Sequence, residues 1–280
     1  MLLGVHVSIS GKIYEAPNRA KELGCNTMQI FSRSPREWRK AQLEKGDIKE
    51  FKSRCKKFKI NPVFVHIPYL VNLASPIRGL REDSIQAYIQ DIRECQDIGA
   101  EYLVTHMGSH KDTSEKSGIK RFSKGLNTIL EATNDSEVMI LLENTAGSGS
   151  WLGYKFGHHR QILDRVINQD RIGFCLDTCH AYVAGYDLAT KDGFNNMIEE
   201  IDSLLGSSRL KLIHLNDSKD KFSSHRDRHE HIGRGTIGLQ GFKRIVRHPK
   251  LKKIPFILET PKKNEGDDLI NLSVVRGLAR

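Results

Sequence analysis

The sequence lacks the signals of a membrane or secreted protein. Among its 280 residues, no apolar run approaches the roughly 20 residues that span a bilayer. The first residues, 1–7, carry no basic leader and already resemble a strand, so we expect no signal peptide. The five cysteines are odd in number and lack the spacing of a zinc knuckle or a redox motif, so we interpret them as reduced, mostly buried thiols. These absences predict a cytoplasmic protein.

Glycine-rich nucleotide-binding motifs are also missing. The chain has no dinucleotide fingerprint, no P-loop and no low-complexity linker, so a single domain over residues 1–280 is the simplest organisation. With 38% hydrophobic and 28% charged residues, the composition is that of an ordinary globular protein. The net charge of +10 favours a polyanionic partner, although many basic proteins bind no nucleic acid.

Short apolar runs alternate with helical stretches along the whole chain. We expect strands at residues 2–9, 27–32, 62–68, 102–108, 138–145, 172–180, 210–217 and 255–261. The clearest amphipathic helices are expected at residues 15–24, 48–58, 82–99, 120–133, 158–168, 193–205 and 269–278. Eight strands that alternate with helices predict an α/β fold, a closed (β/α)8 barrel, with its chemistry at the carboxyl ends of the strands.

Six consecutive strands place a metal-ligating residue near their carboxyl ends. These residues are His66, His106, Glu143, Asp177 with His180, His214 and Glu259. Each follows an apolar run, where an ionisable group is costly unless it is paired or metal-bound. One such residue is usually a hydrogen-bonded core group, but six that converge on the mouth of one barrel predict a metal site.

The loop after the seventh strand adds Asp227 and His229. Two residues apart in extended backbone, they point the same way. With His180 they would form a set of three ligands that leaves a position open for water or substrate. The other six ligands suit a pair of metals, and mixed nitrogen and oxygen ligation favours zinc or manganese over magnesium.

Taken together, these segments resemble the endonuclease IV family of apurinic/apyrimidinic (AP) endonucleases. The resemblance covers nearly the whole chain and is carried by HIPYLVNL from His66, HMGSH from His106, ENTAG from Glu143, CLDTCHA from Cys175, HLNDSK from His214 and DRHEHIG from Asp227. It implies a TIM barrel with three Zn²⁺ ions. The implied ligand sets are His66, His106 and Glu143; Glu143, Asp177, His214 and Glu259; and His180, Asp227 and His229.

The resemblance also implies a reaction and a substrate. The family cleaves double-stranded DNA 5′ to an abasic site, leaving a 3′-hydroxyl and a 5′-deoxyribose phosphate, and clears blocked 3′ ends. A hydroxide held between two zinc ions would attack the phosphorus, and the third zinc would stabilise the leaving 3′-oxygen. Glu143 would bridge two metals, and Glu259 would position or deprotonate the nucleophile. Arg36, Tyr69 and Leu70 match the DNA-binding residues that fill the gap left by the flipped nucleotide, and the resemblance implies a monomer.

Two other functions compete with this interpretation. Sugar isomerases and epimerases on the same barrel also gather His, Asp and Glu around one or two metals. The third ligand set argues against them, because a third metal serves phosphoryl transfer and has no evident use in isomerising a sugar. A protein that only binds damaged DNA would need no metal ligands.

Overall fold

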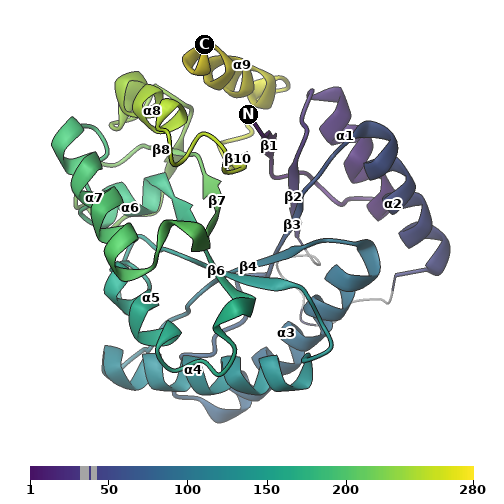
Figure 1. Ribbon diagram of the computed structural model, residues 1–280, viewed down its shortest axis with the longest axis vertical. Coiled ribbons are helices and arrows are strands. Elements are labelled where there is room, and N and C mark those ends of the chain that lie inside the picture. The colour runs from purple at the N-terminus through teal and green to yellow at the C-terminus, as the bar shows by residue number, and fades with distance from the viewer. Residues whose placement is uncertain (32–37, 39–42) are drawn as a thin grey trace.

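The computed structural model describes residues 1–31, 38 and 43–280, and within them eight parallel strands form one closed ring (Figure 1). The strands are β1 (Leu3–Val5), β2 (Met28–Phe31), β3 (Val63–His66), β4 (Tyr102–His106), β5 (Met139–Glu143), β6 (Ile172–Asp177), β7 (Leu210–His214) and β10 (Phe256–Leu258). They follow the order β1-β10-β7-β6-β5-β4-β3-β2. A parallel bridge between His6 and Gln29 closes the ring, and the N–H of Val7 donates to the carbonyl of Gln29 at 2.7 Å.

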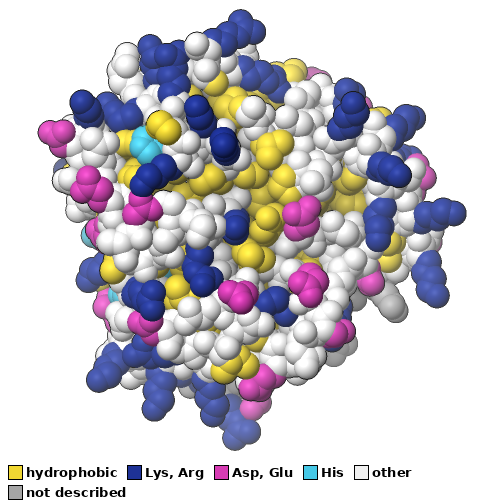
Figure 2. Space-filling view, viewed as in Figure 1, with side chains coloured by type: hydrophobic (Ala, Val, Ile, Leu, Met, Phe, Trp, Pro, Cys, Tyr) yellow, Lys and Arg dark blue, Asp and Glu magenta, His cyan; other side chains and the backbone are white. Residues whose placement is uncertain are grey.

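Helices surround the ring on its outside (Figure 1). They are α1 (Ala16–Glu22), α2 (Lys45–Phe58), α3 (Arg78–Ile98), α4 (Glu115–Ala132), α5 (Phe156–Leu163), α6 (Thr178–Ala184), α7 (Lys191–Leu204), α8 (Gly238–Arg247) and α9 (Asp267–Ala279). The (β/α)8 fold predicted from the sequence is therefore confirmed. Lys and Arg side chains project around the outline of the molecule, in keeping with its net charge of +10 (Figure 2).

Two elements differ from the expectation. The sequence predicts a sixth strand that runs through His180, but the strand ends at Asp177, whose carboxylate accepts a hydrogen bond from the N–H of His180 at 2.8 Å and starts α6. Aspartate is a favoured residue at this capping position, so the predicted ligand itself ends the strand. Helix α8 begins in a segment that resembles a loop because of its three glycines, Gly233, Gly235 and Gly238. Its buried face of Phe242, Ile245 and Val246 has helical spacing.

A layer of six side chains fills the interior of the ring below the mouth, which we call the plug layer. Its members are Phe64, Val104, Leu141, Cys175, Leu212 and Ile257, one from each of six strands, and all are at most 2% exposed. Burying a side chain of the size of Leu or Phe contributes about 1.5–3 kcal/mol. The barrel is therefore filled at this level, and its mouth has an apolar floor.

The described part of the chain holds no helix that combines the length and the apolar character needed to cross a membrane. Its five cysteines are free thiols, and all except Cys55 are buried, as predicted.

Candidate metal centre

Each of the six strand-end ligands lies two residues beyond a member of the plug layer. His66 follows Phe64 in this way, His106 follows Val104, and Glu259 follows Ile257. Because side chains two apart on a strand point to the same side, the ligands form the next layer up, facing the mouth. The same spacing relates Glu143 to Leu141, Asp177 to Cys175 and His214 to Leu212.

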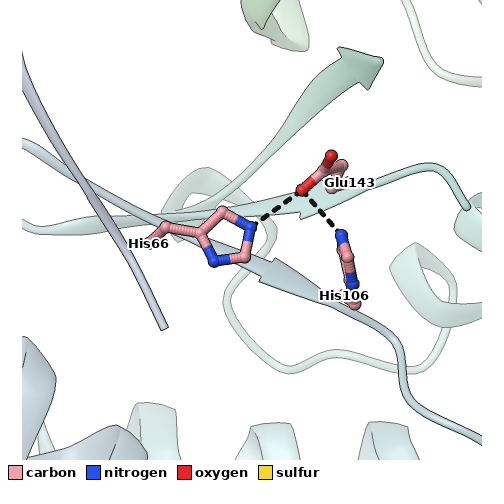
Figure 3. A group of neighbouring side chains, drawn as sticks. All are labelled: His66, His106 and Glu143. Atoms are coloured by element: carbon pink, nitrogen blue, oxygen red, sulfur yellow. Dashed lines mark hydrogen bonds and ion pairs between the residues drawn. The ribbon is translucent and has the colours of Figure 1, made fainter. Parts of the chain in front are cut away.

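The first candidate ligand group comprises His66, His106 and Glu143. The Nε2 atoms of both imidazoles lie 3.0 Å from the same carboxylate oxygen, Oε2 of Glu143 (Figure 3). The three side chains come from neighbouring strands β3, β4 and β5 and converge on one point. Two imidazoles and a carboxylate are a donor set that suits zinc with one position left open.

The second group comprises Glu143, Asp177, His214 and Glu259. Nδ1 of His214 lies 2.9 Å from Oε1 of Glu143 and 3.2 Å from Oε2 of Glu259. Glu143 therefore turns one oxygen to each of the first two groups. This is the position that a bridging ligand would occupy, which only the resemblance had suggested.

The third group comprises His180, Asp227 and His229, the set predicted from the residues themselves. Nε2 of His180 lies 3.1 Å from Oδ2 of Asp227, and Nε2 of His229 lies 3.4 Å from Oδ1 of the same carboxylate. His180 comes from α6, and the other two come from a loop that contains a two-stranded ribbon, β8 (Asp217–Ser218) with β9 (His229–Glu230). The structure thus brings all nine predicted ligands together.

Hydrogen bonds at the far side of the rings orient the imidazoles. Nδ1 of His66, His180 and His229 donates to the backbone carbonyls of Ile67, Asn144 and Glu259 at 2.7, 2.9 and 3.0 Å. Because a carbonyl only accepts, the proton sits on Nδ1 and the lone pair on Nε2 faces the site. The buried Nε2 atoms of His180 and His229 face carboxylates of the site at 3.1–3.5 Å but form no hydrogen bond of good geometry with a described residue, as expected of ligand atoms.

Electrostatics also indicate a site built for cations. Burial opposes ionisation of Glu143, but the imidazoles of His214 and His106 outweigh it and hold the pKa of Glu143 well below its usual range. Burial likewise opposes protonation of His180, yet Asp177 and Asp227 raise the pKa of that imidazole well above its usual value. Glu143 thus stays charged, and the carboxylates around His180 favour the protonated form of its ring. Divalent metal ions would supply this positive charge in place of protons, so the donor set fits a metal centre.

Several residues that support the ligands were not predicted from the sequence. Asn216 donates through Nδ2 to Oδ2 of Asp177 at 2.7 Å and accepts the N–H of Glu259 at 2.8 Å. Asn144 accepts the N–H of Asp177 at 2.7 Å. Asn144 comes one residue and Asn216 two residues after an apolar strand, the same signal that predicted the ligands, and both are buried.

Asp217 anchors the loop that carries Asp227 and His229. Its buried carboxylate accepts backbone N–H groups of Ser218, Gly233, Gly235 and Ile237 at 2.8–3.1 Å. A Cβ atom at Gly235 would lie only 2.5 Å from Oδ1 of Asp217, so glycine is required for this close approach.

Asp217→Ala is expected to loosen this loop and to lower the metal content of the third group. Leaving four backbone N–H groups unpaired should reduce the free energy of unfolding by about 2–4 kcal/mol. Urea denaturation and metal analysis measure the two effects. Asp187→Ala is the control, because Asp187 also accepts backbone N–H groups, from Ala189 at 2.9 Å and Thr190 at 3.3 Å, in a different loop. Equal metal loss in both variants would contradict the anchoring role.

Of the predicted DNA-binding residues, Tyr69 and Leu70 lie in the turn after β3. The Tyr69 side chain is 59% exposed and lines two cavities, one of about 540 Å³ beside Glu259 and one of about 210 Å³ beside His180 and Asp227. Leu70 is half-buried. Arg36 lies outside the described residues.

Known proteins share both the sequence and the fold of this chain. A family model described as "Xylose isomerase-like TIM barrel" matches residues 17–274. A protein from Methanoculleus marisnigri named "Probable endonuclease 4" is 43% identical over 279 residues, covering 100% of this chain and 99% of that protein. The crystal structure of endonuclease IV from Thermus thermophilus is 34% identical, with a TM-score of 0.88 over 99% of this chain and 98% of that chain. The chain belongs to the endonuclease IV family.

Family membership confirms the resemblance predicted from the sequence and makes the chain an endonuclease of this class. The fold alone would not have decided between an endonuclease and a sugar isomerase or epimerase. The structure of a D-tagatose 3-epimerase-like protein also matches, with a TM-score of 0.75 over 98% of this chain, at 18% identity, and this likeness shows the fold only. What separates the endonuclease IV family from such barrels must therefore lie in the residues at the mouth.

Proposed function

We propose that the chain hydrolyses the phosphodiester bond 5′ to an abasic site in double-stranded DNA and also removes blocking groups from 3′ ends. The observation that carries this proposal is the third ligand group of His180, Asp227 and His229 beside the two inner groups. A third metal has a use in phosphoryl transfer and none that is evident in isomerising a small sugar. We further propose that the protein acts as a cytoplasmic monomer.

Three Zn²⁺ ions are the proposed cofactors, one for each ligand group. Five imidazoles and four carboxylates are a mixed donor set that zinc prefers more than magnesium does. When bound, the ions activate a water molecule and neutralise charge on the phosphoryl oxygens. Glu143 would hold the two inner groups at a fixed separation, because its two oxygens lie 3.0 Å from His66 and 2.9 Å from His214.

Glu259 is our candidate for the group that handles the proton of the attacking water. Among the three acids of the inner groups, the side chains of Glu143 and Asp177 are at most 1% exposed, whereas that of Glu259 is 19% exposed and reaches the larger cavity. In the proposed step, the water oxygen bonds to phosphorus, the bond from phosphorus to the 3′-oxygen breaks, and Glu259 takes the proton of the water. The departing 3′-oxygen is protonated from solvent.

Tyr69 and Leu70 are proposed to enter the gap left by the flipped abasic nucleotide, with Arg36 as a third contact. The exposed Tyr69 ring between the two cavities supports this role. Unstacking a base step costs a few kcal/mol, and less where the base is already missing.

Incision of a duplex with one tetrahydrofuran abasic analogue tests the proposal. We expect the purified protein, without added magnesium, to make a single nick 5′ to the analogue. A strong chelator should abolish the nick, zinc should restore it, and metal analysis should find about three zinc ions per chain. Metal-replete protein that isomerises a ketose and leaves the duplex intact would overturn the proposal.

A further inference from the structure

A row of basic residues runs along the outer face of α4, away from the metal centre. Lys116, Lys120 and Lys124 are spaced four residues apart, so they lie on one side of the helix, and all three are exposed. None forms an ion pair with a described residue. Basic side chains gather over α4 at the lower edge of the molecule (Figure 2). Like charges at this spacing repel each other, so an anionic partner along the row would relieve the repulsion.

These lysines line a shallow groove of about 550 Å³ between α4 and the end of α5. Arg165 adds a fourth cation, and Glu131 is the single acid among the lining residues. Ser123 also lines the groove, and its hydroxyl is buried without a hydrogen-bond partner among the described residues, in a side chain that is 3% exposed. An unpaired buried hydroxyl beside four cations is a donor suited to an anionic oxygen.

We propose that this groove binds phosphates of the DNA duplex that flanks the abasic site. Helix α4 follows the carboxyl end of β4, where His106 lies, so Lys116 in its first turn is near the rim of the mouth. From there the lysines descend the side of the barrel in steps of about 6 Å. Each strand of a duplex carries one phosphate per about 3.4 Å of helix axis, so the row is long enough to meet more than one of them. This inference rests on the proposed function, which supplies duplex DNA at the mouth.

The test compares two double variants. One carries Lys120→Ala and Lys124→Ala, and the control carries Lys252→Ala and Lys253→Ala. The control removes the same charge from two exposed lysines between α8 and β10. Binding is measured at several salt concentrations on a duplex with long flanks and on one that covers only the mouth. We expect the slope of log K against log salt to fall by about 1.8 for the long duplex with the α4 variant only, because each phosphate contact contributes about 0.9.

Equal slopes of log K against log salt for the two double variants would overturn the proposal that the groove binds flanking DNA. The same change in slope on both duplexes would overturn it as well. Incision of the short abasic duplex separates this failure from a failure of the proposed function. If wild-type protein and both variants incise it equally, the enzyme activity stands whatever the salt slopes show. If wild-type protein does not incise it, the proposed function itself is wrong.

A second inference concerns Gln29, which is fully buried on β2 beneath Glu259. Its Oε1 atom accepts from Nε2 of His214 at 2.8 Å, and its Nε2 atom donates to Oε1 of Glu259 at 2.7 Å. The same amide nitrogen lies 3.0 Å from Nδ1 of His6. Because Nε2 of His214 carries the proton for this bond, its Nδ1 atom is left as the ligand toward Glu143 and Glu259.

The geometry assigns Gln29 as a positioning residue for the second ligand group. One amide fixes the ring orientation of His214 and one oxygen of Glu259 at the same time. Only a side chain with both an acceptor and a donor can satisfy these two ligands together. Substitutions of residues that orient metal ligands typically lower metal affinity ten- to a hundredfold.

Zinc affinity, measured by competition with a chelator, tests this assignment. Gln29→Met keeps the size of the side chain and removes both hydrogen bonds, so we expect a ten- to hundredfold loss. Gln29→Glu keeps the acceptor for His214 and should lose less zinc affinity. It replaces Gln29→Met in the test if that variant does not fold. Thr27→Val is the control, because it removes a buried hydrogen bond of 2.6 Å to the carbonyl of Pro62 from the residue just before the same strand. Wild-type affinity in Gln29→Met and Gln29→Glu, or an equal loss in Thr27→Val, would overturn the assignment.

Discussion

Glu143→Gln is expected to remove most of the metal and nearly all of the incision activity. Glu143 is fully buried, and its two oxygens face two ligand groups, at 3.0 Å from His66 and His106 and 2.9 Å from His214. The amide has almost the same size but no charge, so both groups lose their shared anionic ligand. A metal ion contributes several kcal/mol to stabilising the transition state. Incision should therefore slow at least about a thousandfold.

Metal analysis and single-turnover incision of an abasic duplex measure this outcome. Glu115→Gln is the matched control, because Glu115 lies at the start of α4, accepts from the Tyr154 hydroxyl at 2.7 Å and belongs to none of the three ligand groups. It should keep its metal and its rate. A Glu143→Gln variant with the full complement of zinc would rule out the shared-ligand arrangement.

His229→Ala is expected to abolish most incision while the barrel stays folded. The residue lies on the short ribbon β9, its ring is 18% exposed, and it contributes to no part of the plug layer. Its removal leaves the third group with His180 and Asp227 only, too few ligands to hold a metal firmly. We expect the loss of one zinc ion per chain and a slowing of about a thousandfold, since one metal contributes several kcal/mol.

His231→Ala provides the comparison within the same loop. Nδ1 of His231 lies 2.9 Å from Nδ2 of Asn271, so this ring packs toward α9 and away from the ligand groups. The control should incise at nearly the wild-type rate, and circular dichroism should show helix content unchanged in both variants. Wild-type incision by His229→Ala would disprove a role for the third group in the chemistry.

The barrel, which the structure confirms, and the candidate ligands were predicted from the sequence for the same physical reason. A buried parallel strand is almost wholly apolar, so a histidine or carboxylate at its end stands out, as His66 and Glu259 do. The start of α6 was missed because Asp177 serves as a ligand candidate and as a helix cap at once. Asp177 accepts the N–H of His180 at 2.8 Å, so replacing Asp177 should also disturb the third group. This cap therefore couples the second and third candidate groups.

The hydrogen-bond partners of the supporting amides could not be predicted, because they are distant in sequence. Gln29 and His214 are 185 residues apart, and nothing in a single sequence pairs them. Asn216 similarly joins Asp177 to Glu259, and Glu259 lies 43 residues beyond Asn216 in the chain. Such contacts follow from the closure of the ring, which the local pattern of apolar residues does not describe.

The plug layer has a consequence for how this architecture can change its chemistry. Each strand-end ligand stands two residues above an apolar side chain that holds its strand in place. The candidate ligands and the plug layer therefore occupy separate positions on the same strands. Ligands can be exchanged through substitution without loss of the underlying core, whereas a one-residue slip of a strand would turn its ligand outward and its plug residue with it. Barrels of this kind can diverge in reaction while their frames stay superimposable.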